Sequence, residues 1–87
     1  MPEIARFYGI IITMYWDDHN PPHFNAKHGE FSAKIEIESC ELLDGEISKK
    51  DLRLLQAWGE LHKEELIYNW NESKKENPMF IKIEPLR

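Results

Sequence analysis

Three of the four histidines lie in one stretch, Trp16 to His28, which also holds two neighbouring carboxylates. Imidazole nitrogens and carboxylate oxygens are the ligands that proteins use for many divalent metals. A bound metal would lower the pKa of a water molecule, and a carboxylate would act as general base. A hydrolase or nuclease centre could therefore be built from Asp18, His19, His23 and, from a later polar run, Glu36.

The same stretch also fits a structural corner that presents a binding surface. Asn20-Pro21-Pro22 cannot continue a helix, because each proline fixes its φ, removes a backbone donor and disfavours the α conformation in the residue before it. Two histidines then flank a stiff turn and can bond its backbone groups, and an exposed tryptophan beside polar groups is typical of an interface anchor. The expected surface consists of Trp16, Asp17, Asp18, His19, His23 and Asn25. We expect no cofactor, with a divalent metal as the alternative.

Composition favours a protein partner over a nucleic acid. The chain has 87 residues, which we interpret as one domain over residues 1–87. A domain of this size has a thin core, and association with a second copy or another protein would stabilise it. Eleven basic and sixteen acidic residues give a net charge of −5. Phosphate binding requires clustered basic side chains, so this balance disfavours nucleic acid and suits a basic protein or a homo-oligomer.

Cysteine usage and hydropathy indicate the compartment. Cys40 has no second cysteine to pair with, which is usual in a reducing cytosol. It would be a nucleophile only with a base beside it, and its neighbours supply no histidine. The apolar run Ile10 to Ile12 is too short for a signal peptide or a membrane span. We expect a cytoplasmic protein with no membrane contact.

Alternating side chains predict an antiparallel sheet of about four to five strands. Residues 2–7 predict an edge strand whose start Pro2 blunts, and residues 10–15 a more central one. Residues 23–28 and 31–38 predict a hairpin around Gly29-Glu30 with a type II′ turn, in which His23 lies opposite Glu36 on the polar face. A short strand through residues 42–43 follows, and Asp44-Gly45 predicts a break in the chain.

The second half of the chain predicts one long helix on the dry face of the sheet. Ser48 followed by Asp51 is typical of a helix start, and the helical pattern continues to about Lys75. An apolar stripe recurs every three or four positions and includes Leu52, Leu55, Trp58, Leu66 and Trp70. Residues 78–87 predict either another edge strand or an arm that docks elsewhere. The fold class is therefore α+β.

Several of these segments together resemble a small family, domain of unknown function 4160. The matching segments are Pro2-x-Ile4-x-Arg6-Phe7-x-Gly9-Ile10, Met14-Tyr15, Asp18-His19-x-Pro21-Pro22-His23-Phe24, Gly29-Glu30, and Glu60-Leu61-His62-x-Glu64-Glu65-Leu66 with Asn69-Trp70. The chain departs from the family at Asn25, where a further histidine is frequent, and at Cys40, where glycine is common. The resemblance implies a partner-dependent protein, often encoded beside another small protein in an arrangement similar to toxin–antitoxin pairs.

Two functional hypotheses follow. The first is an interaction module without enzymatic activity, acting as the acidic, neutralising member of a small protein pair. A ribonuclease usually has basic residues around its catalytic histidine, and this stretch is acidic instead. The alternative is a metal-dependent hydrolase or nuclease that uses the Asp-His-x-Pro-Pro-His corner. Neither hypothesis assigns a substrate.

Overall fold

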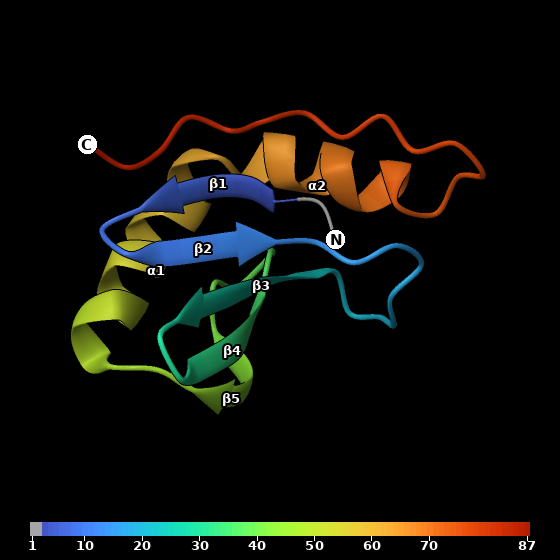
Figure 1. Ribbon diagram of the computed structural model, residues 1–87. Helices are drawn as coiled ribbons and strands as arrows, with labels where there is room; N and C mark the ends of the chain where they lie inside the picture. Colours follow the sequence, from blue (N-terminus) through green and yellow to red (C-terminus); the bar gives the residue numbers. More distant parts are fainter. Residues whose placement is uncertain (1–2) are drawn as a thin grey trace.

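A five-stranded antiparallel sheet with two helices forms the protein, as the computed structural model of residues 3–87 shows (Figure 1). Neighbours in the sequence are neighbours in the sheet, so the strand order is β1-β2-β3-β4-β5. The strands are β1 Glu3–Phe7, β2 Ile10–Thr13, β3 His23–His28, β4 Phe31–Glu36 and β5 Leu42–Glu46. The α+β class is therefore confirmed. Pro2, expected to blunt the first strand, lies outside the described residues.

The hairpin of β3 and β4 has the predicted register. His23 lies opposite Glu36, and His28 lies opposite Phe31 at the turn. The φ of Gly29 is +62° and that of Glu30 is not positive, which agrees with a type II′ turn. This register places Phe24 on the face that the helices cover.

The expected chain break at Asp44-Gly45 is wrong, because both residues belong to β5. Gly45 pairs with Ala33 and has φ +89°, and the register shifts one pair further on, between Lys34 and Ile35. A Cβ atom at this position would lie 2.2 Å from the backbone oxygen of Ser32. The glycine therefore marks a close approach of two strands instead of the end of one.

Two helices stand where one long helix was expected. They are α1 Lys49–Leu61 and α2 Lys63–Glu72, and His62 between them has φ −120° and ψ 26°, outside the helical region. The hydroxyl of Ser48 accepts a hydrogen bond from the backbone N–H of Asp51 at the start of α1, as predicted. The His62 ring contacts Trp58, and its Nδ1 lies 2.6 Å from a Glu65 oxygen, so this side chain bridges the two helices.

The helices lie behind β1 and β2 in Figure 1 and enclose the core against the sheet. Trp58 is fully buried at the centre of this layer. Its indole packs 5.5 Å from the rings of both Phe7 and Phe24. The ring nitrogen of Trp58 donates to the backbone oxygen of Glu84 at 2.8 Å, so the same residue also holds the C-terminal segment.

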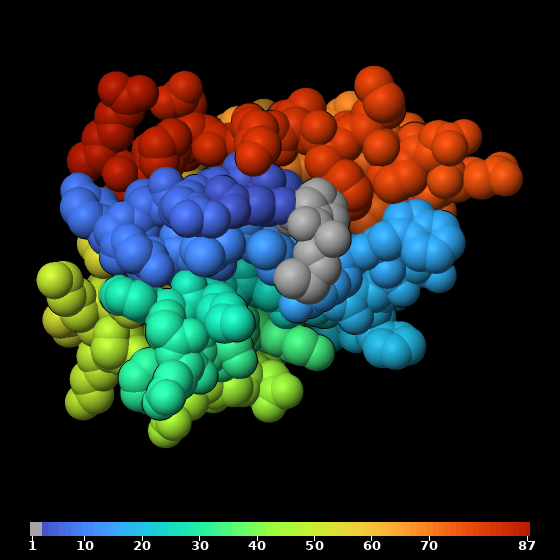
Figure 2. All heavy atoms as spheres, viewed as in Figure 1, coloured from blue at the N-terminus to red at the C-terminus, as the bar shows by residue number. Residues whose placement is uncertain are grey.

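Residues 78–87 form an extended arm, the second of the two predicted possibilities. The arm follows the helices along the border of the molecule beside β1 (Figures 1 and 2). The Asn69 amide donates to the Ile81 oxygen and its carbonyl accepts from the Ile81 N–H, both at 2.9 Å. The Ile83 N–H donates to the oxygen of Ile4 in β1. Asn69 thus pairs with the arm as a neighbouring strand would.

Within residues 3–87, neither helix has the length and apolar character needed to cross a bilayer.

Replacing Trp58 tests the position of the core. We expect Trp58→Ala to lower the free energy of unfolding by about 3–5 kcal/mol, because it leaves a cavity between helix and sheet and frees the Glu84 oxygen. Chemical denaturation followed by circular dichroism measures this loss. Leu61→Ala, at a side chain that is 71% exposed, is the control and should change stability by about 0.5 kcal/mol or less. Equal stabilities of the two variants would show that Trp58 is not part of the core.

Candidate functional site

The Asn-Pro-Pro corner occupies the connection between β2 and β3, residues 14–22. Its backbone is irregular: Asp17 has φ +51°, and the Asn20–Pro21 peptide bond is cis. Because two consecutive prolines supply no N–H, the backbone polar groups of the corner cannot be paired in a regular ladder of strand hydrogen bonds. Its remaining polar groups instead bond to His23 and to the end of α2.

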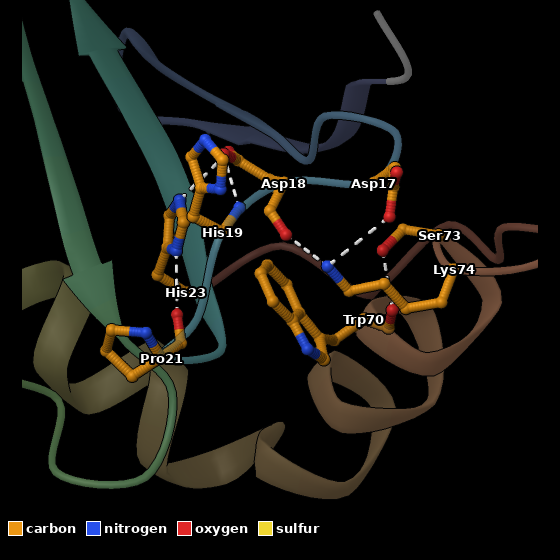
Figure 3. A network of polar contacts seen from close by, with 8 residues as sticks. All are labelled: Asp17, Asp18, His19, Pro21, His23, Trp70, Ser73 and Lys74. Carbon is orange, nitrogen blue, oxygen red and sulfur yellow. Dashed lines mark hydrogen bonds and ion pairs between the residues drawn. The ribbon is translucent and has the colours of Figure 1, made fainter.

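His23 is buried against this corner, with 4% of its surface exposed. Its Nδ1 lies 2.9 Å from the Pro21 carbonyl oxygen and its Nε2 lies 3.0 Å from Asp18 Oδ2 (Figure 3). The ring also packs on Trp70 of α2, with centroids 5.2 Å apart. The His23 ring therefore bridges the Pro21 backbone and the Asp18 carboxylate, both of which belong to the corner.

Asp18 is the charged partner of His23 and is held as a carboxylate. Desolvation in this mostly buried position opposes ionisation, but hydrogen bonds from the His19 backbone N–H and the His23 ring outweigh it. The pKa of Asp18 is therefore lowered from its ordinary value. The Asp18 and His23 side chains are therefore in direct contact inside the corner, where both are largely buried.

The end of α2 provides the other half of the network in Figure 3. The Asp17 N–H donates to the Ser73 carbonyl oxygen at 2.9 Å. The Lys74 ammonium donates to the backbone oxygen of Asp18 and lies 4.5 Å from the centre of the Trp70 ring. These contacts attach the β2–β3 connection to the end of α2, where Lys74 lies 56 positions after Asp18 in the sequence.

Trp16 remains on the surface although its ring nitrogen is bonded. The indole N–H donates to the Lys75 backbone oxygen at 2.9 Å, while 60% of the residue is exposed. His19 is also exposed, and the Asp17 carboxylate, 67% exposed, lies 3.8 Å from the Lys74 ammonium. The corner therefore has a buried half, which includes His23, and an exposed half formed by Trp16, Asp17 and His19.

The predicted metal ligands are only partly brought together. Asp18 and His23 meet, but His19 lies at the surface and the Glu36 carboxylate accepts a hydrogen bond from Ser39 at 2.6 Å. Both ring nitrogens of His23 already lie within hydrogen-bond distance of oxygen atoms of the corner, Pro21 O and Asp18 Oδ2. Within residues 3–87, no three His, Cys, Asp or Glu side chains are grouped closely enough to hold an ion.

His23 and Asn25 differ from the expectation that both face the solvent. His23 is buried because Trp70 closes over this end of the sheet. Asn25, opposite Thr13 in β2, is partly buried, and its Nδ2 has no hydrogen-bond partner among the described residues. An unpaired buried donor is uncommon and calls for an explanation.

The sequence patterns did not identify Trp70, Ser73 and Lys74 as parts of the corner. Trp70 stood out only as a member of the apolar helix stripe, and no local pattern links the other two to residues 14–22. Cys40 has a raised pKa, mainly because burial disfavours its thiolate, so it is not an activated nucleophile. Its φ of +62° lies in the left-handed region that favours glycine.

The lowered pKa of Asp18 predicts acid sensitivity. The stabilisation from the pair is fully present above the ordinary carboxyl value of 3.8 and is lost as pH falls through the lower folded pKa. At neutral pH we expect Asp18→Asn to be about 1–3 kcal/mol less stable than wild type, because the charged carboxylate that bonds the His19 N–H and the His23 ring becomes a neutral amide. The difference should shrink below the ordinary carboxyl pKa.

Thermal melts over a series of acidic pH values measure this effect, with Asp17→Asn as the matched control. The Asp17 carboxylate is mostly exposed, so its variant should stay within about 0.5 kcal/mol of wild type. An Asp18→Asn protein as stable as wild type at pH 7 would show that the pair contributes nothing.

Comparison with known proteins assigns a family but no activity. The family described as Domain of unknown function (DUF4160) matches residues 9–71, a range that contains the corner, the hairpin and most of both helices. No curated protein and no solved structure matches the chain. Because the family match covers well over half of the 87 residues, the chain belongs to the DUF4160 family.

Proposed function

We propose that this protein is a non-enzymatic interaction module that binds a basic protein partner through the exposed half of the corner. The observation that carries the proposal is Trp16, which is 60% exposed although its indole nitrogen is bonded to Lys75. The ring is held in one orientation before any partner arrives, so binding would cost little side-chain entropy. Tryptophan is enriched among the residues that dominate binding energy at protein interfaces.

The charge around Trp16 supports a basic partner. Asp17 is exposed beside it, and the whole chain has a net charge of −5. Complementary charge accelerates association and selects against acidic competitors. Lys74 lies over Trp70 and against the corner backbone, so it is already engaged by the fold.

We further propose the neutralising role in a pair similar to toxin–antitoxin systems, in a reducing cytoplasm. The exposed histidine of the corner, His19, adjoins two aspartates in the sequence, an environment unlike the basic site of a ribonuclease. Cys40 is a free, buried thiol, which suits a reducing compartment. The alternative of a metal-dependent hydrolase has no comparable support, because the ring nitrogens of His23 face oxygen acceptors.

The test is direct binding to the small protein encoded beside this chain. Isothermal titration calorimetry should detect a saturable complex with the purified neighbour, and Trp16→Ala should weaken it by about thirtyfold or more, the loss typical of an interface hot spot. Leu61→Ala removes an equally exposed apolar side chain at the end of α1 and should leave the affinity unchanged.

Two results would contradict the proposal. The absence of any complex would reject the pair, and a Trp16→Ala protein with wild-type affinity would place the interface elsewhere. Circular dichroism of each variant shows that a loss of binding is not a loss of fold.

A further inference from the structure

Glu72, the last residue of α2, is a buried acidic residue in an unfavourable place. Only 5% of its surface is exposed. The carbonyl groups at the end of a helix form the negative end of its dipole, so an acidic side chain there normally lowers the stability of the helix. The stability of α2 therefore does not explain a carboxylate at this position, and its hydrogen-bond partners indicate what it does.

The Glu72 side chain closes the turn that leads from α2 to the C-terminal arm. Its Oε1 accepts a hydrogen bond from the Met79 backbone N–H at 3.0 Å, and its Oε2 accepts one from the Lys75 ammonium. The backbone oxygen of Glu72 also accepts from the Lys75 N–H at 3.0 Å. The bonds from Lys75 and from the Met79 N–H lower the pKa of Glu72, so its carboxylate stays charged. One side chain therefore fixes the turn at both Lys75 and Met79.

The same turn provides the acceptors that hold the exposed half of the corner. The Trp16 indole N–H donates to the Lys75 backbone oxygen at 2.9 Å, and the Asp17 N–H donates to the Ser73 oxygen at 2.9 Å. Lys75 thus bonds Glu72 through its amide and its ammonium, and Trp16 through its carbonyl. Because all three groups belong to one residue, the bonds to Glu72 also fix the position of the acceptor that Trp16 uses.

We propose that Glu72 is a positioning residue of the partner surface: it holds the Lys75 carbonyl in the place where the Trp16 indole donates to it. The inference rests on the proposed function and deepens it, because it names the group that keeps the Trp16 ring in one orientation before the partner arrives. Without this hold the ring would sample several orientations, and ordering it on binding would cost free energy. Glu72 itself is buried and acts only through Lys75.

The experiment measures by NMR how fast the Trp16 indole proton exchanges with solvent in the isotope-labelled free protein, so it requires no partner. Glu72→Ala removes both side-chain bonds, and we expect the exchange to become about threefold to tenfold faster, the factor that corresponds to one hydrogen bond. Glu72→Gln keeps an acceptor for the Met79 N–H but loses the charge, so its rate should lie between those of Glu72→Ala and wild type. Glu76→Ala replaces an exposed glutamate of the same turn and should exchange as wild type does.

The backbone amide protons of β3, the central strand of the sheet, show whether the fold itself has changed. Their exchange rates should be the same in wild type and in all three variants. An unchanged Trp16 rate in Glu72→Ala would overturn the proposal, because Glu72 would then not hold the indole. An equal acceleration at Trp16 and in β3 would overturn it as well, because the substitution would then only lower the stability of the whole protein.

Calorimetric titration with the small protein encoded beside this chain connects the position of the ring to binding. Glu72→Ala should weaken the complex by about threefold to tenfold, the factor by which the indole is freed, and Glu76→Ala should leave the affinity unchanged. Wild-type affinity of Glu72→Ala would overturn the role of Glu72 in the partner surface. Absence of a complex with the wild-type protein would reject the proposed function instead, since the exchange rates of the free protein decide whether Glu72 holds Trp16.

Discussion

The corner between β2 and β3 has backbone polar groups that no regular ladder can satisfy, and this constraint determines how the sheet is joined to α2. Groups from other elements supply the missing hydrogen bonds. The His23 ring bonds the Pro21 carbonyl oxygen, and the Asp17 N–H donates to the Ser73 carbonyl oxygen. The other ring nitrogen of His23 lies 3.0 Å from the Asp18 carboxylate. Burying one member of the pair without the other would leave an unpaired charge, so the corner, the first residue of β3 and the end of α2 form one unit.

A similar solution stabilises the other border of the molecule. The C-terminal arm has no strand partner along most of its length, and side chains of the helices take that place: Asn69 bonds both backbone groups of Ile81, and Trp58 bonds Glu84. A chain of 87 residues buries a limited core, so the contacts that hold the corner and the C-terminal arm matter more to its stability than they would in a larger domain.

Features set by neighbouring residues could be predicted from the sequence. The register of the β3–β4 hairpin follows from strict alternation and a glycine turn, and the start of α1 follows from Ser48. The break at His62 was missed because the apolar stripe continues across it and the residue keeps a helical bond to Trp58. The attachment of the corner was missed because Lys74 is 56 positions from Asp18, and no local pattern encodes a contact at that range.

We propose that the buried half of the corner stabilises the fold and does not hold a metal. It is tested by the unfolding free energies of His23→Ala and His19→Ala, measured with a chelator and again with added zinc, on protein prepared without a metal-affinity column. We expect His23→Ala to lose about 2–4 kcal/mol, because it removes two hydrogen bonds and the contact with Trp70, and His19→Ala to lose about 0.5 kcal/mol or less, with no effect of zinc on any of the proteins. Equal losses in the two variants, or a zinc-dependent stabilisation of wild type that both variants lack, would contradict a purely structural role of the buried half of the corner.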